Sequence, residues 1–185
     1  MPAASIAVLD RDSRWPGQLV GIDMGSNSFR LEVGQLIQGR YRRIDYLKET
    51  VRLGAGLDEN DMLTAQAMQR GVDCLQRFAD RLNGFIPQQI RAVATQTLRE
   101  ARNRDAFLVQ AQAALGHSID VISGREEARL IYKGVARLHP ANVPRLVVDI
   151  GGRSTELILG QGRNPRHAES FHVGCVSLSL KYFPD

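Results

Sequence analysis

A polar, glycine-containing segment that could bind an anion occurs twice in this chain. Residues 23–31 read DMGSNSFRL and residues 149–157 read DIGGRSTEL, so the aspartate, first glycine, serine and final leucine recur at a constant offset (149 − 23 = 126). Each copy follows a short apolar run, at 19–22 or 146–148, as a turn follows a buried strand. The repetition predicts two related lobes, each with its own loop.

The chemistry that these loops offer is phosphate binding. Glycine lets the backbone approach a ligand closely, and successive N–H groups in a tight turn form a concave anion site. Hydroxyl and amide side chains add hydrogen-bond donors. The predicted phosphate-binding residues are Gly25, Ser26, Asn27 and Ser28 in the first copy and Gly151, Gly152, Ser154 and Thr155 in the second.

The aspartate that opens each loop suits a metal better than a phosphate. A carboxylate repels phosphate directly, but it can hold Mg²⁺, which bridges to phosphate oxygens. Asp149 and, less strongly, Asp23 are therefore metal candidates. The alternative is that both segments are ordinary hairpins in which aspartate is a turn former. Because two copies occur in register, we prefer the phosphate-binding interpretation.

Composition narrows the possible partners. The chain has 185 residues, 43% of them hydrophobic, a net charge of +4 and only 6% aromatic residues. The basic balance suits a polyanionic ligand, whereas the scarcity of aromatics argues against single-stranded nucleic acid. No apolar run reaches the roughly 20 residues that span a bilayer. Cys74 and Cys175 lack metal-ligand spacing, and we expect buried thiols in the cytoplasm.

Hydrophobic periodicity predicts an α/β fold with a mixed sheet and flanking helices. Residues 1–18 lack a signal-peptide core and are expected to form a disordered arm. Residues 19–138 are predicted to form a first lobe, and residues 139–185 an incomplete start of a second, with two or three strands and one helix. The expected strands are 19–22, 29–37, 41–53, 90–95 and 119–122, and the expected helices are 64–82, 97–101, 105–115, 123–138 and 177–182.

Several motifs together resemble one family, from about residue 19 to the end of the chain. They are DMGSNSF at 23–29, RLGAGL at 52–57, TLR at 97–99, ISGREEARLIY at 122–132 and DIGGRSTEL at 149–157. The family is that of the exopolyphosphatases and guanosine pentaphosphate phosphohydrolases, and the bacterial exopolyphosphatases look most similar. The resemblance implies actin-like ATPase (ribonuclease H-like) lobes, a cytoplasmic location and Mg²⁺-dependent release of terminal phosphate.

The resemblance also implies roles for single residues. Glu127 aligns with the catalytic glutamate, Arg99 with an arginine near the phosphate, and Asp149 and Glu156 with acids tied to metal. Ser123 and Glu126 are expected to form a capping box at the start of the Glu127 helix. A helix start favours the ionised carboxylate, so we expect Glu127 to position the attacking water rather than to abstract its proton deeply.

Two features depart from the family pattern. The second loop has Arg153 where the family normally has a third glycine. If that position needs positive φ, the arginine is strained by about 1–3 kcal/mol; otherwise Arg153 is a cation beside the phosphates that tightens binding or blocks the site. Family members also continue well past residue 185, so we expect an N-terminal part with a half-built cleft and impaired activity.

These observations leave several functions open. The main hypothesis is a phosphohydrolase that acts on inorganic polyphosphate, with guanosine pentaphosphate as the alternative substrate. A nucleotide-dependent kinase is disfavoured because the Glu127 segment resembles the phosphohydrolases. A non-catalytic polyphosphate-binding module is the third hypothesis. The open sheet edge of the short second lobe predicts a homodimer or other self-association.

Overall fold

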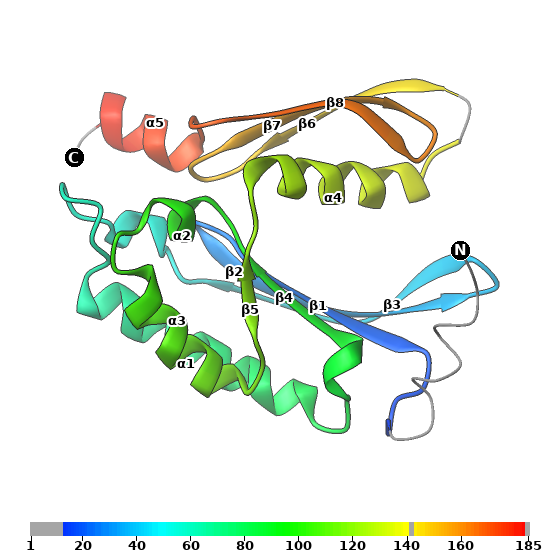
Figure 1. Ribbon diagram of the computed structural model, residues 1–185, viewed down its shortest axis with the longest axis horizontal. Coiled ribbons are helices and arrows are strands. Elements are labelled where there is room, and N and C mark those ends of the chain that lie inside the picture. The colour runs from blue at the N-terminus through cyan, green and yellow to red at the C-terminus, as the bar shows by residue number, and fades with distance from the viewer. Residues whose placement is uncertain (1–12, 141–142, 184–185) are drawn as a thin grey trace.

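The computed structural model describes residues 13–140 and 143–183, which form two stacked α/β lobes (Figure 1). The first lobe has a five-stranded sheet in the order β3-β2-β1-β4-β5. Strands β1, β2 and β3 are antiparallel, whereas β4 and β5 run parallel to β1, which confirms the predicted mixed sheet. The bounds are β1 Gln18–Met24, β2 Ser28–Ile37, β3 Arg40–Thr50, β4 Ile90–Ala94 and β5 Ile119–Val121.

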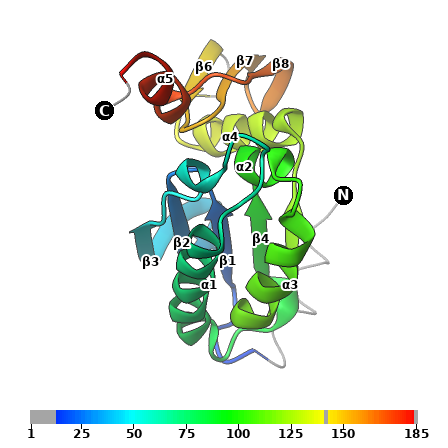
Figure 2. The ribbon, with the colours of Figure 1, turned by 90° about the vertical axis from the view of Figure 1, so that its left-hand side faces the viewer.

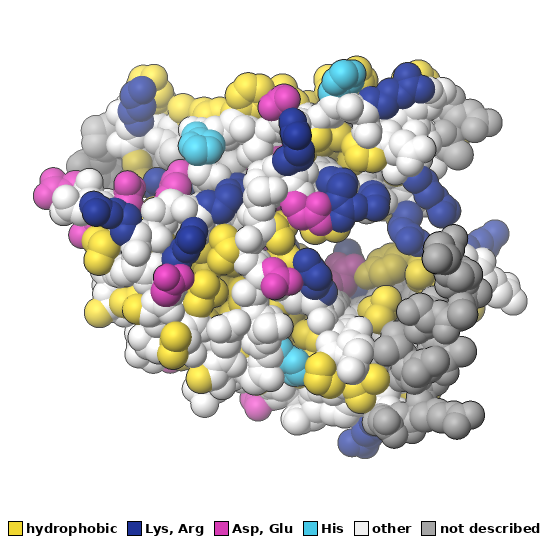
Figure 3. Space-filling model, viewed as in Figure 1, with side chains coloured by type: hydrophobic (Ala, Val, Ile, Leu, Met, Phe, Trp, Pro, Cys, Tyr) yellow, Lys and Arg dark blue, Asp and Glu magenta, His cyan; other side chains and the backbone are white. Residues whose placement is uncertain are grey.

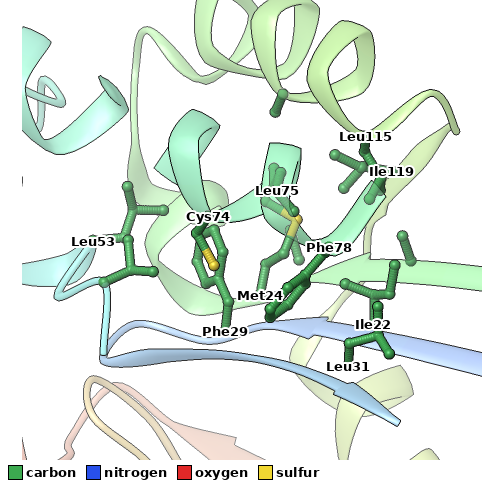
Figure 4. Close-up of a cluster of buried hydrophobic side chains, with 14 of the residues drawn as sticks. Ile22, Met24, Phe29, Leu31, Leu53, Cys74, Leu75, Phe78, Leu115 and Ile119 are labelled. Carbon is green, nitrogen blue, oxygen red and sulfur yellow. The ribbon is translucent and has the colours of Figure 1, made fainter. Parts of the chain in front are cut away.

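Helices α1 (Ala65–Ala79) and α3 (Arg104–Leu115) cover one face of this sheet (Figure 2). Short helix α2 (Gln96–Glu100) follows β4 directly. Apolar residues of α1 recur at helical spacing, so that one stripe packs on the strands. Figure 4 shows Phe29 of β2 beside Cys74 of α1 and Leu31 of β2 beside Ile22 of β1, and all four side chains are buried. This core fixes β1 and β2, and with them the loop that joins the ends of these two strands.

The second lobe has a three-stranded antiparallel sheet in the order β6-β7-β8. Helix α4 packs on this sheet, where Ala128, Tyr132 and Ala136 meet Val147 and Ile158. From the sequence, α4 was expected in the first lobe. Its apolar stripe packs against the second sheet instead, so α4 belongs to the second lobe. The bounds are α4 Gly124–Arg137, β6 Pro144–Ile150, β7 Thr155–Gln161, β8 Asn164–Phe171 and α5 Cys175–Tyr182.

The predicted internal repeat is confirmed in detail. Strands β1-β2-β3 and β6-β7-β8 are both antiparallel meanders, and each carries an irregularity at the same repeat position, at Val33/Gly34 and Leu159/Gly160. Both glycines lie against a tyrosine: a Cβ on Gly34 would meet the ring of Tyr41, and one on Gly160 the ring of Tyr132. At both positions the absence of a side chain leaves room for an aromatic ring, which comes from β3 in the first lobe and from α4 in the second.

The two lobes differ in how much of each sheet is covered. In β1, Ile22 is 1% exposed beneath the helices, whereas its repeat equivalent in β6, Val148, is 51% exposed. Its neighbours on the same face of β6, Leu146 and Ile150, are 63% and 68% exposed. Within the described residues, the outer face of the second sheet has no covering helix.

Other expectations fared differently. Residues 1–12 of the predicted arm lie outside the described residues. The segment that follows binds the first lobe, because Gln89 Nε2 donates to the Trp15 and Gln18 carbonyl oxygens.

Of the two cysteines expected to be buried, Cys74 is buried, but Cys175 is exposed, so the expectation for Cys175 was wrong. In the part of the chain described, none of the helices has the length and apolar character needed to cross a bilayer.

Candidate active site

The two glycine-containing loops have the same backbone structure. Gly25 N donates to Ser28 O at 3.2 Å, and Gly151 N donates to Ser154 O at 2.9 Å. Each loop follows the last residue of one strand and turns directly into the next strand, from β1 to β2 and from β6 to β7. The sequence repeat is therefore also a repeat of loop geometry, which places the N–H groups of both turns alike.

The structure brings the two loops together at the junction between the lobes. A Cβ on Gly152 would lie 3.2 Å from the Ser26 Cβ and 3.6 Å from the Asn27 nitrogen. A Cβ at this position would press on the first loop, which would have to give by a few tenths of an ångström. Gly54 N and Thr97 Oγ1, each at 2.8 Å, hold the Ser26 carbonyl and hydroxyl oxygens.

The remaining loop side chains are placed unequally. Ser28 and Ser154 are buried, at 6% and 4% exposure. Thr155 Oγ1 donates to the Val173 carbonyl oxygen at 2.6 Å, so its hydroxyl braces the second lobe. The backbone of these loops, rather than every hydroxyl, is therefore what they offer to an anion.

Glu127 lies at the start of α4 and faces Arg99 of α2. Arg99 Nη1 donates to Glu127 Oε2 at 2.8 Å, and the two side chains are only 18% and 15% exposed. Ser123 caps the helix by accepting from Glu126 N at 3.2 Å. The Glu126 carboxylate binds Arg129 instead of closing the predicted capping box.

The ionisation of Glu127 differs from the expectation based on the helix start. Burial raises the pKa of Glu127 to about 7; the neighbouring carboxylates of Glu156 and Asp23 add to the rise, whereas Arg99 opposes it. Desolvation disfavours the charged form more than the helix dipole and Arg99 favour it. A carboxylate with such a pKa can accept a proton near neutral pH, so Glu127 is a better base than the sequence suggested.

This pKa predicts the pH dependence of hydrolysis. If ionised Glu127 is required, phosphate release should rise about tenfold per pH unit below pH 7 and level off above it. A divalent cation nearby would move the inflection to lower pH because it favours the carboxylate. Initial rates from pH 5 to 9 would measure this, and a rate that is flat between pH 5 and 7 would contradict the role of Glu127 as a base.

Four carboxylates lie near one another at this junction, those of Glu127, Asp23, Asp149 and Glu156. Asp149 and Glu156 are cross-strand partners in the β6–β7 register. Glu156 is 1% exposed and accepts from Ser170 Oγ at 2.8 Å. Burial also raises the pKa of Asp23; Arg30 lowers it, and the Asp149 carboxylate adds a smaller rise. Acids that disfavour one another's charge are a suitable setting for a cation.

The protein groups alone do not complete a metal site. Among the residues described, no cluster of three or more histidine, cysteine, aspartate or glutamate side chains has metal-binding geometry. Asp149 and Glu156 fit Mg²⁺ by their chemistry, because this ion prefers carboxylate oxygens and retains several waters.

Arg153 is not strained, and its side chain contacts the first lobe. Positive φ at non-glycine residues in the described chain is confined to Gln38, Arg52 and Asp61, so the feared strain at Arg153 is absent. Its side chain turns to the first lobe, where Nε donates to Glu100 Oε2 at 2.8 Å and Nη1 to the Gly54 carbonyl oxygen at 3.2 Å. Two of its five N–H donors thus bind groups of the first lobe.

Sequence reasoning missed three polar residues beside the site. Gln96, Glu100 and Ser170 contact Arg99, Arg153 and Glu156 respectively. The spacing of Gln96 and Glu100, four apart just after a predicted strand, could have signalled a shared helix face. A cavity of about 280 Å³ opens beside Arg99 and is lined by Gln96, Arg99, Ser123, Gly124, Arg125, Ala168, Glu169, Ser170 and His172.

Figure 3 shows acidic and basic side chains gathered along the junction between the lobes. It also shows a hollow at the right of this view, which corresponds to a larger cavity of about 570 Å³. Leu19 and Leu36 line it from the first lobe, and Gly134 and Leu138 from the end of α4. This cavity lies at the opposite end of α4 from Glu127, so it is separate from the candidate site.

Comparisons with known proteins bear on the family and the fold. Guanosine-5'-triphosphate,3'-diphosphate pyrophosphatase of Aliivibrio fischeri is 49% identical over 175 residues, which are 95% of this chain and 35% of the relative. The structure of the Aquifex aeolicus PPX-GPPA enzyme has a TM-score of 0.78 at 30% identity, covering 91% of this chain and 56% of that chain. An exopolyphosphatase from Cytophaga hutchinsonii has a TM-score of 0.82 at 28% identity, covering 90% and 54%.

These matches fix the fold and the family. The chain spans about a third of the length of the curated relative and about half of each solved structure. Its lobes have the actin-like architecture that the resemblance implied. The model of the Ppx/GppA phosphatase family matches residues 35–185, and this chain belongs to that family.

Proposed function

We propose that this chain contributes the site at which water attacks the terminal phosphorus of a phosphoanhydride chain. The observation that carries the proposal is the largely buried Arg99–Glu127 pair beside the two glycine-containing loops. Phosphoryl transfer depends mainly on positioning and on stabilising charge, and this arrangement offers both.

Each group has a distinct part in the proposed reaction. The loop N–H groups hold the phosphate oxygens, and Arg99 stabilises the charge that develops on the transferred group. Glu127, with its pKa near 7, orients the water and accepts its proton. Asp149 and Glu156 would hold Mg²⁺, which supplies charge neutralisation at the phosphate oxygens.

We propose inorganic polyphosphate as the substrate, with guanosine pentaphosphate as the second candidate. The Cytophaga hutchinsonii structure, named as an exopolyphosphatase, supports the first. The name of the Aliivibrio fischeri relative, a guanosine pyrophosphatase at 49% identity, supports the second. Both candidates end in a phosphoanhydride, which the loops would grip in the same way. Both cysteines are free, which suits the cytoplasm as the location.

Phosphate release without any acceptor tests the proposal. The chain would be assayed with Mg²⁺ and either long-chain polyphosphate or guanosine pentaphosphate at equal concentrations of terminal phosphate. Release from either substrate supports hydrolysis, and the ratio of kcat/KM values selects the substrate. Phosphate transfer that requires a hydroxyl acceptor would instead identify a kinase.

Self-association through the second sheet is a further expectation. Exposed Leu146, Val148 and Ile150 share one face of edge strand β6, and an apolar edge of this kind pairs with another copy. The mass from light scattering should rise above the 20.5 kDa monomer with concentration, and Val148→Lys should suppress the rise. The control Leu138→Lys, at the end of α4, should have no effect. A constant monomer mass would contradict the expectation.

A further inference from the structure

A continuous chain of side-chain hydrogen bonds links the second glycine-containing loop to Glu127. Arg153 Nε donates to Glu100 Oε2 at 2.8 Å, and Gln96 Nε2 donates to Glu100 Oε1 at 2.6 Å. Arg99 Nε then donates to Gln96 Oε1 at 3.0 Å, and Arg99 Nη1 to Glu127 Oε2 at 2.8 Å. The links at 2.8–3.0 Å lie within the normal range for N–H···O bonds, and the Gln96–Glu100 link at 2.6 Å is slightly shorter.

Local helix geometry explains how the middle of this chain is assembled. Gln96, Arg99 and Glu100 occupy positions i, i+3 and i+4 of α2, so their side chains share one face. Arg153 approaches that face from the β6–β7 loop, and Glu127 approaches it from α4. Both come from the second lobe, so α2 of the first lobe is held between them.

Because these side chains are largely buried, the bonds between them should constrain the site more than bonds at the surface would. Gln96 is 1% exposed, and the side chains of Glu100 and Arg153 are 23% and 20% exposed. Water competes poorly for such groups, and a polar network with a low local dielectric is worth more than the same contacts on the surface. Removal of one member leaves the next without its partner.

The orientation of the Gln96 amide is the decisive element. An amide has a donor end and an acceptor end, and the donor end faces the Glu100 carboxylate. The acceptor oxygen must therefore face Arg99, which donates to it from both Nε and Nη2. These two donations to one oxygen, together with the bond from Nη1 to the Ile122 carbonyl oxygen at 2.9 Å, fix the plane of the guanidinium that contacts Glu127.

We infer that Arg153 is a positioning residue for the hydrolysis, which it serves by fixing Glu100 and, through Gln96, the guanidinium of Arg99 against Glu127. The inference rests on the proposed function. It gives Arg153 a role that needs no contact with substrate, through its bonds to Glu100 and to the Gly54 carbonyl oxygen. The salt bridge also ties the second loop to the first lobe beside the site.

The first test separates positioning from phosphate binding. With Arg153→Met, kcat should fall about tenfold while KM stays within twofold, because misplaced catalytic groups slow chemistry more than binding. Arg153→Lys should recover part of kcat, since an ammonium can still pair with Glu100. Adding Glu100→Gln to Arg153→Met should cost little more, as expected for members of one network. A rise in KM at unchanged kcat would overturn the inference.

A second test does not depend on activity. In ¹⁵N spectra of arginine side chains, the Arg99 Nε–H signal, assigned by its loss in Arg99→Lys, should shift and exchange faster with water in Arg153→Met and in Glu100→Gln. The matched control is Arg77→Met, which breaks a surface pair between Arg77 of α1 and Glu49 of β3 and should leave the signal unchanged. An unaltered Arg99 signal in Arg153→Met would refute the inference. If the wild-type chain released no phosphate, the proposed function would fail, and this spectrum would still test the network.

Discussion

Replacement of Glu127 by glutamine should reduce phosphate release by about 10²–10⁴-fold. Glutamine keeps the size of the side chain and its bond to Arg99 through the amide oxygen, but it can neither accept a proton nor carry the negative charge. The measurement is the initial rate of phosphate release from polyphosphate with Mg²⁺, together with the affinity for polyphosphate. Affinity should change little, because in the proposed site the loops rather than Glu127 hold the phosphates.

Glu126→Gln is the matched control for this variant. Glu126 precedes Glu127 on the same helix turn, but its carboxylate pairs with Arg129 at the surface. Its replacement should alter the rate by less than about twofold, since exposed ion pairs contribute little. Equal losses in both variants would show that helix structure, not the Glu127 carboxylate, had been disturbed. Polyphosphate binding by a wild-type chain that releases no phosphate would point to a non-catalytic binding module.

Truncation of Tyr132 to alanine should destabilise the second lobe far more than the first. Tyr132 is fully buried and is the largest side chain in a core otherwise made of Ala128, Ala136, Val147 and Ile158. Removal of a buried aromatic side chain costs about 3–5 kcal/mol, a large part of the stability of a small domain. Hydrogen exchange should accelerate in β6, β7 and β8 while β1 and β4 remain protected, because the first-lobe core is separate.

Tyr132→Phe provides the control for this experiment. It keeps the ring between α4 and the sheet and removes only the hydroxyl, which donates to the Gly162 carbonyl oxygen at 3.3 Å. The expected cost is about 0.5–1.5 kcal/mol. Equal acceleration of exchange in both lobes of Tyr132→Ala would contradict the division into two cores.

The repeat and most elements could be predicted because local patterns determine them. Helix α1 was expected over 64–82 and spans Ala65–Ala79, followed by a 3₁₀ turn at Asp80–Leu82, since its apolar stripe has helical spacing. The third strand was expected to reach residue 53 but ends at Thr50. There the amides of Val51 and Arg52 turn to the Asn27 carbonyl oxygen, so the chain leaves the sheet to support the first loop.

Features that depend on distant partners could not be predicted. The apolar stripe of α4 shows that the helix packs, but it does not show against which sheet. The direction of the Arg153 side chain depends on Glu100, which lies 53 residues earlier in the sequence. The raised pKa of Glu127 arises from burial that only the folded lobes create. Residue types identified the members of the candidate site, whereas packing decided which of them touch.

Hydrolysis in ¹⁸O-labelled water tests the central claim most directly. The wild-type chain would be incubated with Mg²⁺ and unlabelled polyphosphate, and the released phosphate analysed by mass. Attack of water on the terminal phosphorus predicts inorganic phosphate that carries one ¹⁸O atom per molecule, formed only when Mg²⁺ is present. Phosphate without solvent oxygen, or no release of phosphate at all, would contradict the claim.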